Sequence, residues 1–358
     1  MKANYTIVVI VLSFMAVFSS LTGICQTNKT EEETLFPIKL DGKEGYIDIS
    51  GNIVIKPQFD EVGYFSEGFA SVKIGEKYGF IDKTGKTVIK PQFDYASQFS
   101  EGLAEILIGD WTDGKWGFID NTGKIIINPQ YNGVHYFSEG LACFKTGHFP
   151  ESKCGFVDKT GMIVINPLYN DVFPFTEGLA KVLIGDWTDG KVGFIDKTGK
   201  YLINPKYDGS RMFCEGLACV KKDEKWGFID KNDNYIINPQ FDLGGDFSEG
   251  LAMVEINDCW GYIDKTGAFV ISPQFHDATA FSDGLALVRI GGEKGIGKYG
   301  FIDKTGRYII NPQYEFALSF KGGLAAVNNS NQFQYIDKNG NIIWSSNEYP
   351  RVFELYNH

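Results

Sequence analysis

The stretch WGFIDNTGKIIINPQYNGVHYFSEGLA, residues 116–142, decides the fold of this 358-residue chain. It joins a Gly-aromatic-Ile-Asp run, a Thr-Gly turn, an isoleucine-rich run ending in Asn-Pro, and a Phe-Ser-Glu-Gly-Leu-Ala segment. The pattern recurs nine times at steps of 34 to 39 residues. Such a period indicates a repeat architecture whose units stack on their neighbours. The first glycine of each unit is Gly45, Gly79, Gly117, Gly155, Gly193, Gly227, Gly261 or Gly300, with Gln334 in its place in a degenerate ninth unit.

Each unit reads as a set of short strands. In the unit 103–139, the segments 103–108, 116–120 and 124–128 are rich in β-branched and aromatic residues. We expect Pro129 to end the third strand, because proline has no N–H to donate to a ladder. Residues 131–137 form a fourth extended or irregular segment. No segment has helical periodicity of any length, so the sequence predicts an all-β chain of short antiparallel hairpins.

An aspartate ends the Gly-aromatic-Ile-Asp run in every unit. It stands three residues before a glycine, as in Asp82-Lys83-Thr84-Gly85, which suits a type I turn closed by a left-handed glycine. Asp233 replaces the glycine in one unit and is among the few other residue types that tolerate this conformation. We therefore expect turn chemistry here, not a metal or catalytic site, and we interpret the glutamate of Ser-Glu-Gly as a turn residue too.

The aromatic column (Phe80, Phe118 and their equivalents) has Ile or Val as its chain neighbour in every unit. Successive strand residues face opposite sides, so this strand is apolar on both faces and the rings are expected in the core. The glycine before each ring marks a place where a ring or backbone approaches closely.

Three segments carry a resemblance to a known family: Trp116–Asp120, Trp226–Asp230 and Trp260–Asp264. Together with the Asn-Pro-Gln and Phe-Ser-Glu-Gly-Leu-Ala motifs, they resemble the WG repeat of bacterial proteins over about residues 36–356. The resemblance implies a repetitive β fold found in many envelope-associated or multidomain proteins. It implies no agreed activity and no catalytic residues. In other units the first Trp is replaced by Glu44, Tyr78, Cys154, Val192 or Tyr299.

Two architectures can use such units. Nine units of mostly 34 residues exceed the usual four to eight blades of a propeller and are shorter than usual blades. The ninth unit has also lost its glycine, its proline and its Ser-Glu-Gly motif, as a capping repeat would. The expectation is therefore an open, curved, solenoid-like array of antiparallel β-hairpins, with a closed propeller-like toroid as the alternative.

Residues 1–25 are interpreted as a signal peptide. Lys2 precedes an uncharged apolar core, residues 7–18, which is too short for a comfortable membrane span, and Gly23-Ile24-Cys25 precedes a cleavage point. The residues before Cys25 fit a lipobox poorly, which argues against a lipid anchor there. Residues 26–35 are a short polar leader, and residues 36–358 form a single repeat domain. The mature chain is expected to be periplasmic, secreted or on the cell surface, without membrane insertion.

The charge and cysteine content of the chain restrict the classes of partner and cofactor that it is expected to bind. The formal net charge is −11, and residues 1–25 contain one lysine and no acidic residue, so their removal gives −12. An acidic chain argues against binding to nucleic acid or to anionic lipid. The cysteine spacings match no zinc or redox motif, and no cofactor or metal is expected.

Insertions fall in one place of the repeat, between Ser-Glu-Gly and the next Trp-Gly. Long versions occupy residues 109–115, 146–153 and 185–191, in three consecutive hairpins. Insertions in repeat proteins map to one face, often the binding face. The first and third are identical, and each places a Trp between two Asp. The alternative is that both Trp side chains fold back over their own hairpins. The candidate binding residues are Asp110, Trp111, Asp113, His148, Phe149, Asp186, Trp187 and Asp189.

These features lead to three functional hypotheses. The first is a non-enzymatic exported scaffold that binds another protein, because no nucleophile, metal-binding or phosphate-binding motif is present. The second is a glycan-binding module that uses the long-loop aromatics. The third, and least favoured, is a cell-wall polymer hydrolase, which would need two carboxylates at glycosidase separation.

Overall fold

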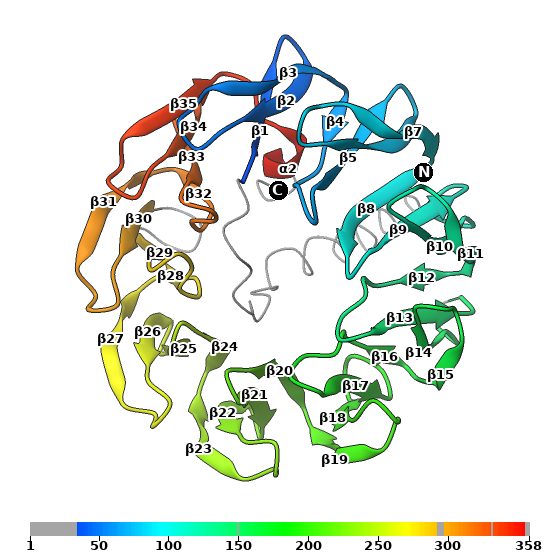
Figure 1. Cartoon of the computed structure of the whole chain (residues 1–358). Coiled ribbons are helices and arrows are strands. Elements are labelled where there is room, and N and C mark those ends of the chain that lie inside the picture. The colour runs from blue at the N-terminus through cyan, green and yellow to red at the C-terminus, as the bar shows by residue number, and fades with distance from the viewer. Residues whose placement is uncertain (1–33, 149, 292–296, 331, 355–358) are drawn as a thin grey trace, which may run out of the picture.

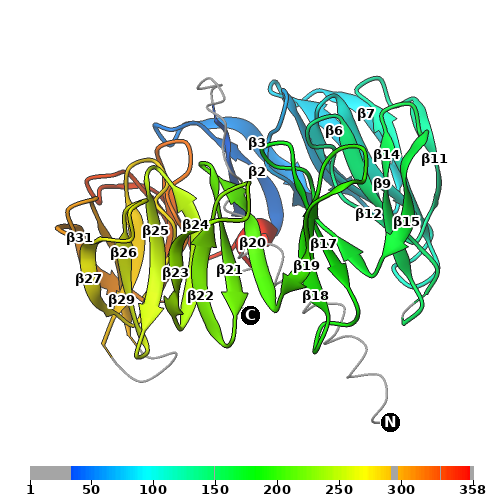
Figure 2. The same cartoon turned by 90° about the horizontal axis from the view of Figure 1, so that it is seen from below.

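The strands form a closed ring of nine antiparallel sheets, which we call blades (Figure 1). The computed structural model describes residues 34–148, 150–291, 297–330 and 332–354. The predicted signal peptide, most of the leader and Phe149 lie outside these ranges. Seen edge-on, the strands of each blade run from one face of the ring to the other (Figure 2). The fold is therefore a nine-bladed β-propeller arrangement.

The first five blades have the following strands. Blade 1 contains β1 (Phe36–Leu40), β2 (Lys43–Ile47) and β3 (Ile53–Phe59). Blade 2 contains β4 (Glu61–Val62), β5 (Phe69–Ile74), β6 (Lys77–Asp82) and β7 (Thr87–Phe93). Blade 3 contains β8 (Tyr95–Ser100), β9 (Leu103–Ile108), β10 (Lys115–Asp120) and β11 (Ile125–Tyr131). Blade 4 contains β12 (Gly133–Val134), β13 (Leu141–Thr146), β14 (Lys153–Asp158) and β15 (Ile163–Tyr169). Blade 5 contains β16 (Asp171–Val172), β17 (Ala180–Ile184), β18 (Lys191–Ile195) and β19 (Tyr201–Tyr207).

The remaining blades follow the same order, and the described chain ends in a short helix. Blade 6 contains β20 (Gly209–Cys214), β21 (Leu217–Lys222), β22 (Lys225–Ile229) and β23 (Tyr235–Phe241). Blade 7 contains β24 (Leu243–Ser248), β25 (Leu251–Ile256), β26 (Cys259–Ile263) and β27 (Phe269–Phe275). Blade 8 contains β28 (Asp277–Ala278), β29 (Ala286–Ile290), β30 (Lys298–Ile302) and β31 (Tyr308–Tyr314). Blade 9 contains β32 (Phe316–Ala317), β33 (Ala325–Asn329), β34 (Gln332–Ile336) and β35 (Ile342–Ser346), and α2 (Arg351–Glu354) follows.

The open array expected from the sequence is wrong, and the closed toroid is correct. Blades 1 and 9 share a hydrophobic cluster that includes Ile38 and Ile47 on one side and Phe333 and Tyr335 on the other. The Tyr335 hydroxyl donates a 2.9 Å hydrogen bond to the Pro37 carbonyl across this seam. The ninth unit, which lacks the repeat motifs, packs on the first blade and on the C-terminal segment and does not cap a free end.

The helix α2 lies at the inner edge of blade 1, the side on which blade 2 has β4 (Figure 1). Its Phe353 side chain is buried in the seam cluster. The Arg351 backbone N–H donates to the Glu44 carboxylate over 2.7 Å, and the Val62 N–H of blade 2 donates to the same carboxylate over 2.8 Å. Glu44, at a Trp position of the repeat, thus connects the C-terminal segment to blades 1 and 2.

The third strand of each unit continues through its proline, contrary to expectation. The strand β11 runs to Tyr131, two residues beyond Pro129. It is the outer edge strand, so the missing N–H costs nothing on its open side, and the ladder is irregular here: Trp116 pairs with Tyr131 but Phe118 pairs with Ile127. A Cβ on Gly117 would lie 2.4 Å from the Ile127 carbonyl oxygen, so the predicted close approach is to backbone.

The aspartate turns are confirmed. Asp82 Oδ1 accepts hydrogen bonds from the backbone N–H of Thr84 (2.9 Å) and Lys86 (3.1 Å). Gly85 has φ of 83°, and Asp233 takes the same conformation with φ of 68°. These hydrogen bonds account for the aspartate in every unit.

The glutamate of Ser-Glu-Gly has a further role that the sequence did not reveal. It adopts a positive φ (54° at Glu67), and its carboxylate accepts hydrogen bonds from the next blade. Glu67 accepts from the N–H groups of Glu101 and Gly102 over 2.7 and 2.8 Å. Equivalent bonds join Glu101 to Gly140, Glu139 to Gly178, Glu177 to Gly216, Glu215 to Gly250, Glu249 to Gly284, and Asp283 to Gly323. This column therefore links each of blades 2 to 8 to the blade that follows it.

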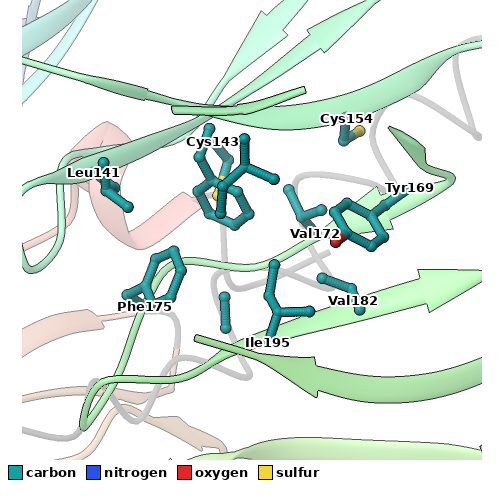
Figure 3. Packing of buried hydrophobic residues seen from close by; sticks show 11 residues of the cluster. Leu141, Cys143, Cys154, Tyr169, Val172, Phe175, Val182 and Ile195 are labelled. Atoms are coloured by element: carbon teal, nitrogen blue, oxygen red, sulfur yellow. The ribbon is translucent and has the colours of Figure 1, made fainter. Parts of the chain in front are cut away.

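The core lies between adjacent blades, as the apolar pattern on both strand faces predicts. Figure 3 shows one such layer, where Cys143 and Tyr169 of blade 4 meet Val172, Phe175 and Val182 of blade 5. None of the five cysteines among the described residues is in a disulfide. Within the same residues, no helix is long and apolar enough to cross a membrane.

Candidate functional site

The three long hairpins lie on one face of the ring, in the adjacent blades 3, 4 and 5. Strands in a blade are antiparallel, so the Ser-Glu-Gly and Asp-x-x-Gly turns share one face of the ring and the hairpins share the other. We call the second the loop face. It also carries the connections between blades, where Asp94 binds the Gly109 N–H over 2.9 Å and the Lys77 ammonium over 2.6 Å.

The blade 3 loop is held by hydrogen bonds of its own. Asp110 Oδ1 accepts from the N–H groups of Thr112 (2.8 Å) and Asp113 (2.9 Å) and from the Thr112 hydroxyl (2.6 Å). These donors, the hydroxyl first, lower the pKa of Asp110. The Gly114 N–H donates to the Asp110 carbonyl over 2.8 Å. Asp110 is therefore a turn residue that fixes the loop.

Trp111 packs partly on its own blade. Its ring centroid lies 5.0 Å from that of Tyr95 and 5.6 Å from that of Trp116, and Tyr95 also contacts Tyr78 at 5.3 Å. Even so, 47% of Trp111 stays exposed. The Trp111 side chain thus folds back over its own hairpin and still remains partly exposed. The result is an aromatic cluster open to solvent on the loop face.

Trp187 rests differently although its loop sequence is identical. In blade 5 the positions of Tyr95 and Trp116 are taken by Asp171 and Val192, so the aromatic neighbours are missing. Trp187 instead meets Phe173 edge-on at 6.3 Å and is 60% exposed. The Thr188 hydroxyl and the N–H groups of the loop lower the pKa of Asp186 to about 2. The two loops of identical sequence therefore hold their indole rings against different aromatic neighbours.

The other predicted residues contribute less. Asp113, His148 and Asp189 are exposed. Phe149 lies outside the described residues. The structure brings the three loops onto one face, but among the predicted residues that it describes there is no hydrogen bond, ion pair or ring contact across blades.

Sequence reasoning missed a group of ionisable residues on the first two strands of blades 5 to 7. Lys181 lies 3.3 Å from the centre of the Phe173 ring and donates to the Ser210 carbonyl over 3.2 Å. Arg211 Nε donates to the Gly244 carbonyl over 3.3 Å. No signal in the sequence marks Lys181, because its column varies from unit to unit and elsewhere holds Ser71, Glu105, Cys143, Cys219 and Met253.

Metal binding finds no support in the part of the chain that the structure describes, where no group of three His, Cys, Asp or Glu could hold an ion. Asp110 and Asp186 accept hydrogen bonds within their own turns. The loop face carries the exposed indole rings of Trp111 and Trp187 on loops fixed by hydrogen bonds. This arrangement is suited to binding.

Comparison with solved structures supports the fold. A crystal structure of the eukaryotic initiation factor is similar with a TM-score of 0.61 at 13% identity, covering 89% of this chain and 97% of that one. Prolyl endopeptidases match at 11% identity with a TM-score of 0.42, over 75% of this chain and 51% of theirs. Hsv2p of Kluyveromyces lactis matches at 13% identity with a TM-score of 0.34, over 47% and 60%. The first likeness shows the fold alone.

Among curated proteins, none matches this chain. The family model described as "WG containing repeat" matches eight tandem segments, residues 45–78, 78–110, 116–147, 155–186, 193–226, 226–258, 260–293 and 299–332. These segments cover most of the chain and coincide with the repeats quoted from the sequence. The chain therefore belongs to the WG containing repeat family.

Proposed function

We propose that this chain is an exported, non-enzymatic propeller scaffold that binds a protein partner on the loop face of blades 3 to 5. The observation that carries the proposal is the pair of exposed indoles, Trp111 and Trp187, on two identical loops of one face. Trp is among the residues that dominate binding energy at protein interfaces. A loop fixed by Asp110 loses little entropy on binding. Residues 1–25 support export to the envelope or beyond.

The test is capture of a partner from envelope extract by the mature chain, followed by direct titration of the purified partner. The double variant Trp111→Ala/Trp187→Ala should lose binding at least tenfold. Tyr235→Ala, which removes a partly exposed ring on the outer strand of blade 6, is the matched control and should bind normally. Equal binding by the double variant, or measurable turnover in an activity screen with no partner recovered, would contradict the proposal.

A glycan ligand is the second candidate, and one observation favours it. Tyr78, Tyr95, Trp111 and Trp116 form a continuous aromatic cluster with ring separations of 5.0 to 5.7 Å. Such a surface can stack against the apolar face of a sugar ring. Glycan-array binding that disappears in Trp111→Ala but persists in Trp187→Ala would favour this reading, and a blank array would count against it.

A further inference from the structure

The outer edge of blade 4 carries an apolar surface that the other blades lack. The strand β15 is the outermost of its sheet, at the rim of the ring (Figure 1). Met162, which directly precedes β15, is 63% exposed, Leu168 within it is 64% exposed, and Ile163 and Val164 are exposed as well. The outer strands of the other eight blades, all of which the structure describes, have at most two exposed large apolar residues each. We call the surface of residues 162–164 and Leu168 the β15 edge.

Two positions of the β15 edge are polar in the sister blades. The column of Met162, at the start of the outer strand, holds a basic residue in four other blades, as Lys86, Lys124, Lys200 and Arg307. The column of Leu168, directly after the strand proline, holds glutamine in six blades and lysine in one: Gln58, Gln92, Gln130, Gln240, Gln274, Gln313 and Lys206. The fold therefore does not require apolar side chains at these two positions. Charged residues on an edge strand keep it from pairing with another chain, and β15 lacks this protection.

The β15 edge contains no charge, which favours a second copy of the chain as its occupant. Residues 162–169 include no Asp, Glu, Lys or Arg, whereas the whole chain has a formal net charge of −11. Two copies of so acidic a chain repel each other. Two β15 edges can nevertheless meet without removing a charge from water, which would be costly. Such a contact between identical surfaces closes at two copies, because each chain has one β15 edge.

The charges that flank the β15 edge complement one another when two copies meet antiparallel. The two-fold axis of such a pair is normal to the blade 4 sheet, so each of blades 3 and 5 lies beside its own equivalent with the loop faces on opposite sides. Lys124 and Lys200, at the ends of blades 3 and 5 away from the loop face, are exposed and form no salt bridge with the described residues. Asp113 and Asp189 are exposed at the loop-face ends of the same two blades. Each lysine of one copy therefore lies at the end where the other copy presents a carboxylate.

We propose that the protein forms a two-fold dimer in which the β15 edges of two copies pack antiparallel about Val164. Pro167 has no N–H to donate, so backbone pairing between the copies is limited to residues 162–166, whose midpoint is Val164. Leu168 of one copy then lies diagonal to Met162 of the other, within reach for side-chain packing. The dimer goes beyond the proposed function and leaves both loop faces open, on opposite sides of the assembly.

Sedimentation equilibrium of the mature chain tests the dimer. At about 100 μM we expect a mass of twice the chain, which corresponds to a dissociation constant in the micromolar range or below. A chain that stays monomeric up to this concentration overturns the inference, because the β15 edge is then left open or is covered by a different molecule.

A sister blade supplies the variant. Met162→Lys/Leu168→Gln gives blade 4 the residues that blade 3 holds as Lys124 and Gln130. The double variant should keep a cooperative thermal transition, and its dimer dissociation constant should rise at least about tenfold, because the contact then buries two charges and loses apolar area. Ile236→Lys, which places a charge on the exposed outer strand of blade 6, is the matched control and should dimerise like wild type. Wild-type dimerisation by the double variant would reject the β15 edge as the interface.

A cysteine at the two-fold axis keeps the test decisive if the double variant fails to fold. Val164→Cys places the thiols of the two copies on either side of the axis, close enough for a disulfide, so mild oxidation should give a covalent dimer on a non-reducing gel. Val88→Cys, in the same column of blade 2 and also exposed, should stay monomeric on that gel. Equal cross-linking of the two variants, or none in a Val164→Cys chain that sediments as a dimer, would contradict the proposed pairing.

Discussion

The backbone N–H of Arg351 donates to the carboxylate of Glu44 over 2.7 Å, and this bond joins the last helix of the chain to its first blade. Glu44 is fully buried and also accepts from Val62 of blade 2. The Arg351 side chain forms an ion pair with Glu61 in blade 2. One short segment thus connects both ends of the repeat array. The stability of this seam therefore depends on the protonation state of the Glu44 carboxyl group.

The first prediction concerns pH. Burial raises the pKa of Glu44 from 4.5 to about 7, outweighing the two N–H donors. A carboxyl whose folded pKa is raised contributes stability below its unfolded pKa and loses it as pH rises through the folded value. The free energy of unfolding of wild type relative to Glu44→Gln should therefore fall by about 3 kcal/mol between pH 4 and 8. Denaturant titrations at several pH values measure this difference.

The matched control for this series is Glu76→Gln, on an exposed hairpin of blade 2. Its free energy of unfolding should run parallel to that of wild type across the range. A Glu44→Gln profile parallel to wild type would show that Glu44 does not titrate with folding.

The second prediction concerns the repeat glycine. A Cβ at Gly79 would lie 2.4 Å from the Ile89 carbonyl oxygen and 2.7 Å from the Pro91 nitrogen, and backbone cannot move aside cheaply. Gly79→Ala should lower the free energy of unfolding by about 3 kcal/mol or more. Gly133→Ala is the control, because its nearest contact, Lys145 Cβ at 3.7 Å, is ordinary, and the change should stay within about 0.5 kcal/mol. Similar losses in the two variants would argue against the steric reading.

The third prediction concerns closure. A chain ending after Tyr314 lacks blade 9 and α2, so it exposes the apolar faces of blades 1 and 8 together. We expect the remaining blades to lose their cooperative thermal transition, measured by circular dichroism, and to aggregate on size exclusion. A chain ending after residue 354 should melt like the full chain. A truncated chain that keeps a sharp transition near the full-length temperature would mean that the blades are stable without the ring.

The fourth prediction separates the two identical loops. Trp111 contacts Tyr95 and Trp116, and each aromatic pair contributes roughly 0.5–1.5 kcal/mol, so Trp111→Ala should cost about 1–2 kcal/mol of unfolding free energy. Trp187→Ala, with a single edge contact, should cost less than about 0.5 kcal/mol. Chemical denaturation of the two single variants gives the comparison. Equal losses of unfolding free energy in the two variants would show that the loop itself, and not the residues against which the indole packs, determines how much each tryptophan stabilises the fold.

The sequence predicted what is local to a repeat and failed on what is not. The Asp82 turn, the close approach at Gly117 and the buried aromatic column follow from backbone sterics and strand alternation within one unit. Closure depends on the small angle between neighbouring blades, summed over nine of them, and on a segment after residue 346 that belongs to no repeat. The lost motifs of the ninth unit were therefore misread as a free end.

The candidate site shows the same division. Loop length and identity placed Trp111 and Trp187 correctly on one face, because insertions at one point of a repeat must share a side. Their different packing could not be predicted, since it depends on which residues several strands of blades 3 and 5 place beside the loop. Lys181 and Arg211 come together only because blades 5 and 6 are neighbours, which the sequence of a single repeat does not show.

The seam between blades 1 and 9 has a mechanical consequence. The described chain begins and ends beside it, and it is held by the Tyr335–Pro37 bond and by Glu348, whose carboxylate accepts from the N–H groups of Asp41 and Gly42 over 2.9 and 2.8 Å. Tension applied to the two ends of the chain would load this seam before any other junction. Rupture should then travel around the ring one blade at a time, as a sawtooth of similar steps, because the junctions from blade 2 to blade 9 repeat the same carboxylate-to-glycine bond.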